Sequence, residues 1–436
     1  MYESLWPQPE SLVLYQDLLA RGPGAAMAAF LEAAPHGGGE ARRAYLDLVR
    51  TLFQFEDVPG PTGDAWQDYV IQGVLCADNA FTRAASAGSV SRALREAAAW
   101  DLMHLQECFR LSRVRCLALV GGGVPDEKLP TWAGRAESNE AGPFVAAAFR
   151  AMARRLAGAE RWADLVDELA DFHRAQGFGA VARTWFLTWD GARLVPVDQP
   201  DVIDLDDLAG LEDQKKAVQE NTEAFLRGGP GLNLLLYGPR GTGKSSVVRA
   251  LAKRYGDAGL RLVEVGRDRL SSLGDLYRTV RRYPQRFVLF LDDLTFEADD
   301  ADYRAFKSLL EGALERRPPN LVLYVTSNRR HMVPERWSDR GSPEEAEVHG
   351  QDALEERLSL ADRFGRTILF LRPDQEEYLR IVEHLVARRN LPIGREEVRE
   401  EARRWALWQN GLSGRTARQF VDDLEARLQA ERARGT

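Results

Sequence analysis

A glycine-rich segment, GPRGTGKS, carries the residue types that bind the phosphates of a nucleotide. It consists of Gly238, Pro239, Arg240, Gly241, Thr242, Gly243, Lys244 and Ser245, and Ser246 follows it. The three glycines let the backbone curl so that successive N–H groups point at one anion. Lys244 would reach the β- and γ-phosphates, and the Ser245 hydroxyl would ligate a Mg²⁺ ion that bridges them. We therefore expect a site for ATP and Mg²⁺ here, and a chance loop match is the alternative.

Two further stretches place polar side chains after apolar runs. Phe287–Leu291 leads into Asp292 and Asp293, and Leu321–Thr326 is closely followed by Asn328. Paired carboxylates at the end of a buried strand are costly unless a cation or hydrogen bonds offset them. We interpret Asp292 as a Mg²⁺ ligand through water, and Asp293 as the group that orients or deprotonates the attacking water. Asn328 could hold that water without adding negative charge, although turns and caps use the same residue types.

The pattern around these residues predicts a parallel sheet that brings them together. The predicted strands are Leu234–Tyr237, Leu260–Val265, Phe287–Leu291, Leu321–Thr326 and Thr367–Leu371. A helix is expected over residues 246–252, and its N-terminal dipole would add to the phosphate site. Strands that alternate with helices form a parallel sheet covered on both faces. Ligands bind at the carboxyl ends of such strands, where the loop, the two acids and the amide all lie.

The regions on either side of this predicted sheet read as mainly helical. Helical spacing recurs in Ala41–Phe55, Trp66–Ala85 and Val90–Leu111 before the sheet, and in Gln375–Arg389, Arg395–Trp408 and Arg415–Arg427 after it. From Ala180 to Val197 the pattern changes to alternating residues around Asp190 and Gly191, which predicts a hairpin. Prolines and an acidic run between 196 and 207 indicate a linker.

Composition limits the classes of protein that this chain can represent. Its 436 residues exceed one ordinary domain. The start of the chain carries an acidic residue where a signal peptide carries basic ones, and its apolar runs are too short for a membrane helix. We therefore expect a cytoplasmic protein without a membrane segment. A net charge of −8 argues against broad attraction to nucleic acid, although a local basic strip could still bind it. The best strip is Arg278, Arg281, Arg282 and Arg286, and a solvated helix end is its simpler interpretation.

Five segments together resemble an AAA+ ATPase, a P-loop NTPase, from about Asp204 to the end of the chain. They are LYGPRGTGKSS, FVLFLDDLTF, LVLYVTSNRR, LADRFG and LSGRTARQF, and they occur in the order and spacing of that family. The resemblance implies a Walker A loop at 238–245, Walker B acids at Asp292 and Asp293, and sensor 1 at Asn328. It also implies an adenine-side segment that contains Gly210, an arginine finger at Arg363 and sensor 2 at Arg415.

The motifs are closest to those of initiator or loader types and of the bacterial branch-migration motor. One departure concerns the Walker B ending, which is commonly Asp-Glu in the family and is Asp292-Asp293 here. Because the second carboxylate is shorter by one methylene, slow turnover is expected. Glu297 is the alternative base. The whole chain also resembles an uncharacterised bacterial AAA+ family with a helical N-terminal region. This resemblance identifies relatives but does not indicate a function.

We therefore expect a mainly helical partner or substrate domain over residues 1–200, an α/β ATPase core over 205–372 and a helical lid over 373–436. The expected activity is Mg²⁺-dependent ATP hydrolysis coupled to remodelling or loading of an unidentified macromolecule. The alternatives are a slow nucleotide-gated switch and a P-loop kinase, which shares the loop but would lack a lid arginine such as Arg415. The resemblance also implies a homo-oligomeric ring, such as a hexamer, because Arg363 would act on the nucleotide of a neighbouring subunit.

Overall fold

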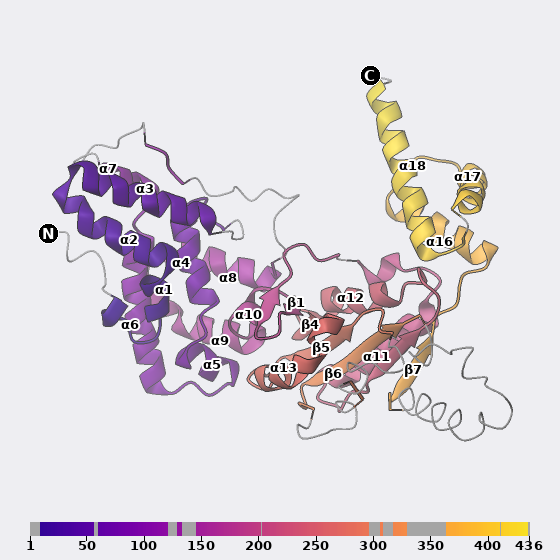
Figure 1. The fold of residues 1–436 in the computed structure, drawn as a ribbon, viewed down its shortest axis with the longest axis horizontal. Helices are drawn as coiled ribbons and strands as arrows, with labels where there is room; N and C mark the ends of the chain where they lie inside the picture. The colour runs from indigo at the N-terminus through magenta and orange to yellow at the C-terminus, as the bar shows by residue number, and fades with distance from the viewer. Residues whose placement is uncertain are drawn as a thin grey trace, which may run out of the picture. The chain divides into compact units, whose positions relative to one another are not determined.

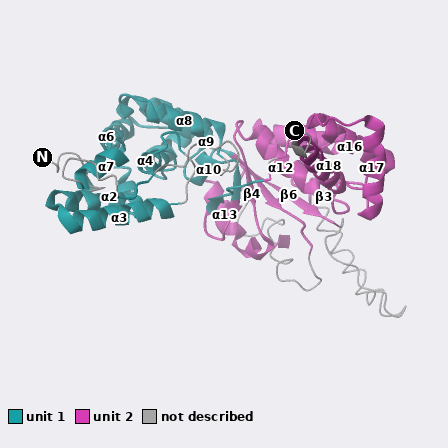
Figure 2. Cartoon of the chain, turned by 90° about the horizontal axis from the view of Figure 1, so that it is seen from above, with its two compact units in different colours: residues 1–187, 194–200, 282–285 teal, residues 188–193, 201–281, 286–436 magenta. Residues whose placement is uncertain are grey.

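The computed structural model describes residues 9–55, 60–120, 129–132, 145–201, 203–295, 306–307, 317–328, 363–409 and 411–434. Two compact units divide the chain, as Figure 2 shows. The first comprises residues 1–187, 194–200 and 282–285, and the second comprises residues 188–193, 201–281 and 286–436. Neither unit is continuous in sequence, and each is described by itself below.

The first unit is a helical assembly. Its helices are α1 Gln16–Ala20, α2 Gly22–Ala33, α3 Gly38–Gln54, α4 Ala65–Leu75, α5 Ala80–Ser86, α6 Arg92–Phe109, α7 Arg113–Val120, α8 Ala147–Ala157, α9 Val166–Gln176 and α10 Ala180–Arg183. The predicted helix over Trp66–Ala85 is two helices, because Asn79 and Thr82 form a capping box that starts α5. Buried Asp101 accepts hydrogen bonds from the backbone N–H groups of Val13, Leu14 and Tyr15, which ties this segment to α6.

The predicted hairpin is shorter than its alternating pattern. Strand β1 spans Phe186–Trp189 and strand β2 spans Leu194–Pro196, while residues 180–183, which we expected to be extended, form α10. The turn follows the predicted residues: Asp190 Oδ1 accepts from the N–H groups of Ala192 and Arg193, and Gly191 has φ 103°. Such a positive φ suits glycine because it has no Cβ.

One seven-stranded sheet has the order β2-β1-β4-β5-β6-β3-β7. Strands β3 Leu234–Tyr237, β4 Leu260–Glu264, β5 Arg286–Leu291, β6 Leu321–Ser327 and β7 Arg366–Leu369 lie within about two residues of the predicted strands. The pairs β4 with β5, β5 with β6, β6 with β3 and β3 with β7 are all parallel. All carboxyl ends of these five strands therefore meet at one edge of the sheet.

Helices cover this sheet in the second unit, as Figure 1 shows. They are α11 Glu212–Leu226, α12 Lys244–Tyr255 and α13 Leu273–Val280. Helix α11 is joined to strand β6 by a buried contact, because Asn221 Nδ2 donates to the hydroxyl of Tyr324 at 3.0 Å. Strand β6 is buried along its whole length, as a central parallel strand requires.

Three helices at the end of the chain form a lid with its own apolar core. They are α16 Gln375–Arg388, α17 Arg395–Trp408 and α18 Gly414–Arg434. Their core includes Tyr378, Val382, Ala402 and Phe420. The lid is tied to the segment before α11, where Arg388 Nε donates to Asp207 Oδ1 at 2.7 Å and His384 Nε2 lies 2.7 Å from the carbonyl oxygen of Asp206.

The predicted fold class is confirmed: the chain has an α/β P-loop core with a parallel sheet, a C-terminal helical lid, and a mainly helical N-terminal part with a hairpin. Among the described helices, none has both the length and the apolar character to cross a membrane.

Candidate functional site

The glycine-rich loop connects strand β3 to helix α12 through backbone conformations that only glycine adopts without strain. Gly238 has φ 147°, and a Cβ there would lie 2.0 Å from the carbonyl oxygen of Phe370. Gly243 has φ 93° and directly precedes the first residue of α12. The loop therefore delivers the N-terminus of a three-turn helix to the carboxyl edge of the sheet, which favours an anion there.

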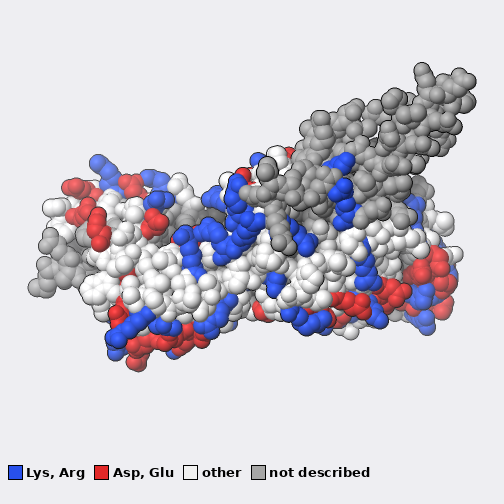
Figure 3. Space-filling view, turned by 90° about the horizontal axis from the view of Figure 1, so that it is seen from below, with Lys and Arg blue, Asp and Glu red and all other residues white. Residues whose placement is uncertain are grey.

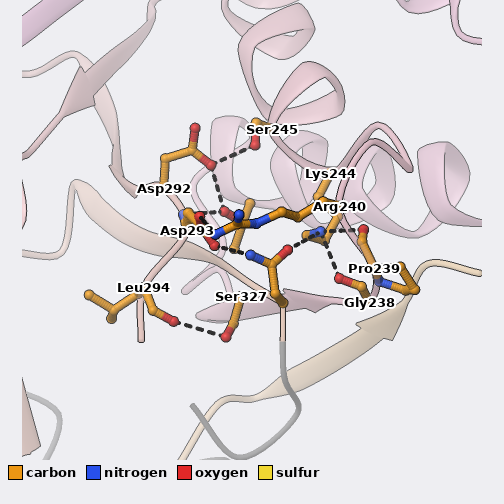
Figure 4. Close-up of polar contacts among 11 residues, drawn as sticks. Gly238, Pro239, Arg240, Lys244, Ser245, Asp292, Asp293, Leu294 and Ser327 are labelled. Atoms are coloured by element: carbon orange, nitrogen blue, oxygen red, sulfur yellow. Dashed lines mark hydrogen bonds and ion pairs between the residues drawn. The ribbon is translucent and has the colours of Figure 1, made fainter. Parts of the chain in front are cut away.

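The side chain of Lys244 packs against this loop (Figure 4). Its Nζ donates to the carbonyl oxygens of Gly238 and Pro239, both at 2.8 Å, and lies 3.3 Å from Asn328 Oδ1. Only 7 % of the residue is exposed. Burial lowers the pKa of Lys244, and the carboxylates of Asp293 and Asp292 act in the opposite direction. The loop, Lys244 and the Asn328 amide thus form one connected group.

Asp292 is held by two hydroxyl groups on one of its oxygens (Figure 4). Ser245 Oγ donates to Asp292 Oδ1 at 2.5 Å, and Thr326 Oγ1 donates to the same oxygen at 2.6 Å. A hydroxyl in direct contact with a carboxylate offers two hard oxygen donors, which is the donor chemistry that Mg²⁺ prefers. The residues therefore fit the predicted metal.

Asp293 adopts a strained backbone conformation. Its φ is 49°, one of two positive values among the described non-glycine residues. Thr326 Oγ1 accepts from the N–H of Asp293 at 2.8 Å and so supports this conformation. The carboxylate accepts from Asn328 Nδ2 and, at 3.3 Å, from Arg240 Nη2. Strain of this kind persists only where surrounding contacts enforce it, and it is common at active sites.

A cavity of about 1090 Å³ opens beside the loop within the second unit. Its lining includes loop residues 241–246, Asp292, segment 207–214 with Gly210, and residues of the lid helices. Gly210 lies against Ile381 of α16, and the carbonyl oxygen of Gly241 faces the start of α18 at Gly414. The cavity therefore has a phosphate loop on one side and the lid on the other.

Arginines of the lid differ sharply in their contacts. Six of those away from the cavity form ion pairs: Arg388, Arg389, Arg395, Arg399, Arg404 and Arg427. Three arginines that line the cavity, Arg380, Arg415 and Arg418, have no ion-pair or hydrogen-bond partner among the described residues. Unpaired cations that share a cavity with a phosphate loop suit a polyanionic ligand.

Two predicted features lie elsewhere or outside the described residues. Arg363 is exposed ahead of strand β7 and is not among the described residues that line the cavity. Glu297, the alternative base, lies outside the described residues.

Sequence reasoning missed several residues of the site. Thr326, Arg249, Arg380 and Arg418 all contact or line it. The helical spacing of Arg415 and Arg418, three residues apart on α18, could have indicated that both share a face. Thr326 and Arg249 act across neighbouring elements, which spacing along the chain does not reveal.

Arginines of the basic strip are engaged in contacts with other residues of the chain. Arg278 pairs with Asp275, and Arg282 lies 2.9 Å from Asp78. Arg286 donates to the carbonyl oxygen of Pro319 at 3.0 Å. Figure 3 shows one face, on which basic side chains lie in small clusters among uncharged side chains and beside acidic ones.

Comparisons with known proteins give one family match and several distant likenesses. A family model described as "Protein of unknown function (DUF815)" matches residues 181–428. ORC1-type DNA replication protein 14 of Haloarcula marismortui is 43% identical over 60 residues, which cover 14% of this chain and 14% of that protein.

Solved structures with detectable likeness include RuvB of Thermotoga maritima, described as a Holliday junction branch migration motor. That structure has 15% identity and a TM-score of 0.31, and the match covers 51% of this chain and 72% of that chain. For one mutant form of the same protein the identity is 15% and the TM-score is 0.33, with 51% and 73% covered.

Proposed function

The chain belongs to the DUF815 family and has an AAA+ P-loop core, and from the geometry of its site we propose that it binds ATP with Mg²⁺ and hydrolyses it. One observation carries the proposal. The Walker A loop, its lysine, its serine and the Walker B aspartate are joined by direct hydrogen bonds at the wall of a cavity that the lid also lines. The arrangement supplies backbone N–H groups, a lysine and lid arginines for phosphates, and oxygen donors for Mg²⁺.

The chain's own residues would divide the work as follows. Loop N–H groups, Lys244 and Arg415 bind and orient the phosphates, and Ser245 and Asp292 hold the metal, which supplies charge neutralisation when bound. Asn328 lies beside Lys244 and is joined to Asp293, so these two side chains would hold the attacking water. Asp293 Oδ would accept its proton.

Lys244 must change its partners when nucleotide binds. Its ammonium donates to two carbonyl oxygens of the loop, so these bonds would be exchanged for bonds to phosphate oxygens. Because the charged phosphate is the stronger acceptor, the exchange favours binding. Nucleotide binding would therefore replace the hydrogen bonds between Lys244 and the loop.

A second candidate function is a slow nucleotide-gated switch. The observation that favours it is the ground-state contact of Asp293 with both Arg240 and Asn328. A carboxylate that already accepts from two donors must give up one of these hydrogen bonds before it can hold an attacking water. Under this alternative the chain holds ATP and hydrolyses it rarely.

A wider role in remodelling or loading rests on the family resemblance. Action on an unidentified macromolecule through the N-terminal unit, and assembly into a ring in which Arg363 reaches a neighbouring site, remain parts of the proposal. The names of two distant relatives concern DNA replication and branch migration.

The test is a comparison of ATP binding with phosphate release by the full chain. Isothermal titration with ATP and Mg²⁺ gives the affinity, and single-turnover measurement gives the hydrolysis rate. Saturable binding with turnover supports the ATPase, binding without measurable hydrolysis supports the switch, and absence of binding contradicts both.

A further inference from the structure

Arg249 of helix α12 bridges two carboxylates at the carboxyl edge of the sheet. Its Nη2 lies 3.1 Å from Asp292 Oδ2, and 3.2 Å and 3.3 Å from the two carboxylate oxygens of Glu264. Its guanidinium stands 5.6 Å from the ring centroid of Phe290, which supports it from one side. Arg249 and Asp292 each keep 26% of their side chains exposed. This contact is therefore held in place yet open to the cavity, which both residues line.

The two oxygens of Asp292 have different partners. Oδ1 accepts from Ser245 and Thr326, whereas Oδ2 accepts from Arg249. The carboxylate that would hold Mg²⁺ is thus already paired with a resident cation, which it shares with Glu264. A divalent cation beside Ser245 would meet the charge of Arg249 within a few ångströms, and like charges at that distance repel.

Glu264 is a second carboxylate that the guanidinium of Arg249 already reaches. It ends strand β4, which pairs with strand β5, and Asp292 directly follows β5. Both oxygens of Glu264 are already within reach of Nη2. A small rotation of the guanidinium would therefore break the bond to Asp292 and keep a full ion pair with Glu264.

We propose that Arg249 is a positioning residue that neutralises Asp292 before the metal arrives and moves onto Glu264 when Mg²⁺ binds with nucleotide. This inference rests on the proposed nucleotide function and deepens it, because it makes the Arg249–Glu264 pair the element that sets the Mg²⁺ requirement of the site. Arg249 lowers the affinity for the metal, and Glu264 partly restores it by drawing Arg249 away.

The test measures binding of a non-hydrolysable ATP analogue, adenylyl imidodiphosphate, to the full chain by isothermal titration over a range of Mg²⁺ concentrations. Arg249→Met should lower the Mg²⁺ concentration needed for half-maximal tightening by roughly fivefold to tenfold, since it removes a nearby positive charge. Glu264→Gln should raise it by a similar factor. In Arg249→Met/Glu264→Gln, the effect of Glu264→Gln should vanish, because Glu264 acts through Arg249.

Controls separate this inference from general electrostatics and from misfolding. Lys253→Met, on the same helix but paired with Asp204 at 2.9 Å, should leave the Mg²⁺ requirement unchanged. Arg249→Gln, which keeps a hydrogen-bond donor without the charge, should behave like Arg249→Met and replaces it if the methionine variant does not fold. An unchanged Mg²⁺ requirement in the Arg249 variants, or an equal effect of Glu264→Gln in both backgrounds, overturns this inference alone. Failure of the wild-type chain to bind the analogue at any Mg²⁺ concentration overturns the proposed function with it.

Discussion

At the scale of single residues, Thr326 organises both acids of the site. Its hydroxyl donates to Asp292 and accepts from the backbone N–H of Asp293, so one side chain on β6 fixes a carboxylate and a strained backbone on the neighbouring segment. The glycine loop, Asp292, Asp293 and Asn328 were predictable because each follows an apolar strand closely in sequence. Thr326 was not, because its role depends on β5 and β6 lying side by side.

Asp293→Asn should keep nucleotide binding and lose hydrolysis by roughly 10²-fold or more, since it removes the proposed proton acceptor. The fold should survive, because asparagine tolerates the left-handed conformation that φ 49° requires. Single-turnover phosphate release measures the effect, and Asp275→Asn on helix α13 is the control. A wild-type hydrolysis rate in Asp293→Asn would show that another acid is the base, and Glu297 is the one that the sequence suggests.

At the scale of elements, the lid contributes more cations to the site than the sequence indicated. Helix α18 brings both Arg415 and Arg418 to the cavity, and α16 brings Arg380. The helices themselves were predictable from apolar spacing and breakers, and α16 and α17 lie within one residue of expectation. Which of their many arginines face the cavity depends on lid packing and on acidic partners distant in sequence, such as Glu383 for Arg399.

Arg418→Ala should weaken ATP binding by roughly tenfold if its guanidinium bonds a phosphate oxygen, which corresponds to a charge-assisted hydrogen bond. Arg403→Ala is a matched control, because Arg403 is an exposed lid arginine that does not line the cavity. Titration with ATP and with ADP compares the two variants. Equal affinities of Arg418→Ala and Arg403→Ala would remove Arg418 from the binding site.

Helix α9 of the first unit contains a buried histidine that should make this unit sensitive to acid. His173 is fully buried, its Nδ1 bonds the carbonyl oxygen of Gly177 at 2.9 Å, and burial lowers its pKa from near 6.5 to about 4. The unfolded chain therefore binds a proton between these values that the folded chain excludes. Stability should fall as the pH drops from about 6.5 toward 4, by up to about 3 kcal/mol.

Denaturant unfolding of the full chain at several pH values, followed by tryptophan fluorescence, measures this slope. His173→Asn should be less stable at neutral pH, because it leaves a cavity, yet its stability should depend less on pH in this window. His36→Asn, at an exposed position, should keep the wild-type slope. An unchanged slope in His173→Asn would show that other groups cause the acid sensitivity.

At the scale of the whole molecule, each of the two compact units takes up short segments from distant parts of the chain. Residues Arg282–Gln285, which lie between α13 and β5 in sequence, group with the first unit, where Gln285 Nε2 donates to the carbonyl oxygen of Arg174. Local pattern does not reveal such an exchange, because it depends on contacts between residues about 110 positions apart in the chain. The domain bounds at 200 and 372 stay predictions.

Arg363 tests whether the active form is an oligomer. Arg363→Ala should bind ATP normally and hydrolyse it poorly, because an arginine supplied by a neighbour stabilises transition-state charge by roughly 10³–10⁵ in rate. Mixing it with Asp293→Asn should restore some activity, since mixed interfaces join an intact Arg363 to an intact Asp293. No rescue at any mixing ratio, together with a monomeric ATP-bound species in ultracentrifugation, would contradict the shared site.

The central claim is that the Walker A loop binds nucleotide, and Lys244→Ala tests it most directly. The folded variant should lose ATP affinity by roughly tenfold or more in isothermal titration, because it removes the cation that faces the β- and γ-phosphates. Lys253→Ala, on the same helix but paired with Asp204, should bind ATP like the wild type. Wild-type ATP affinity in a folded Lys244→Ala protein would contradict the assignment of the site.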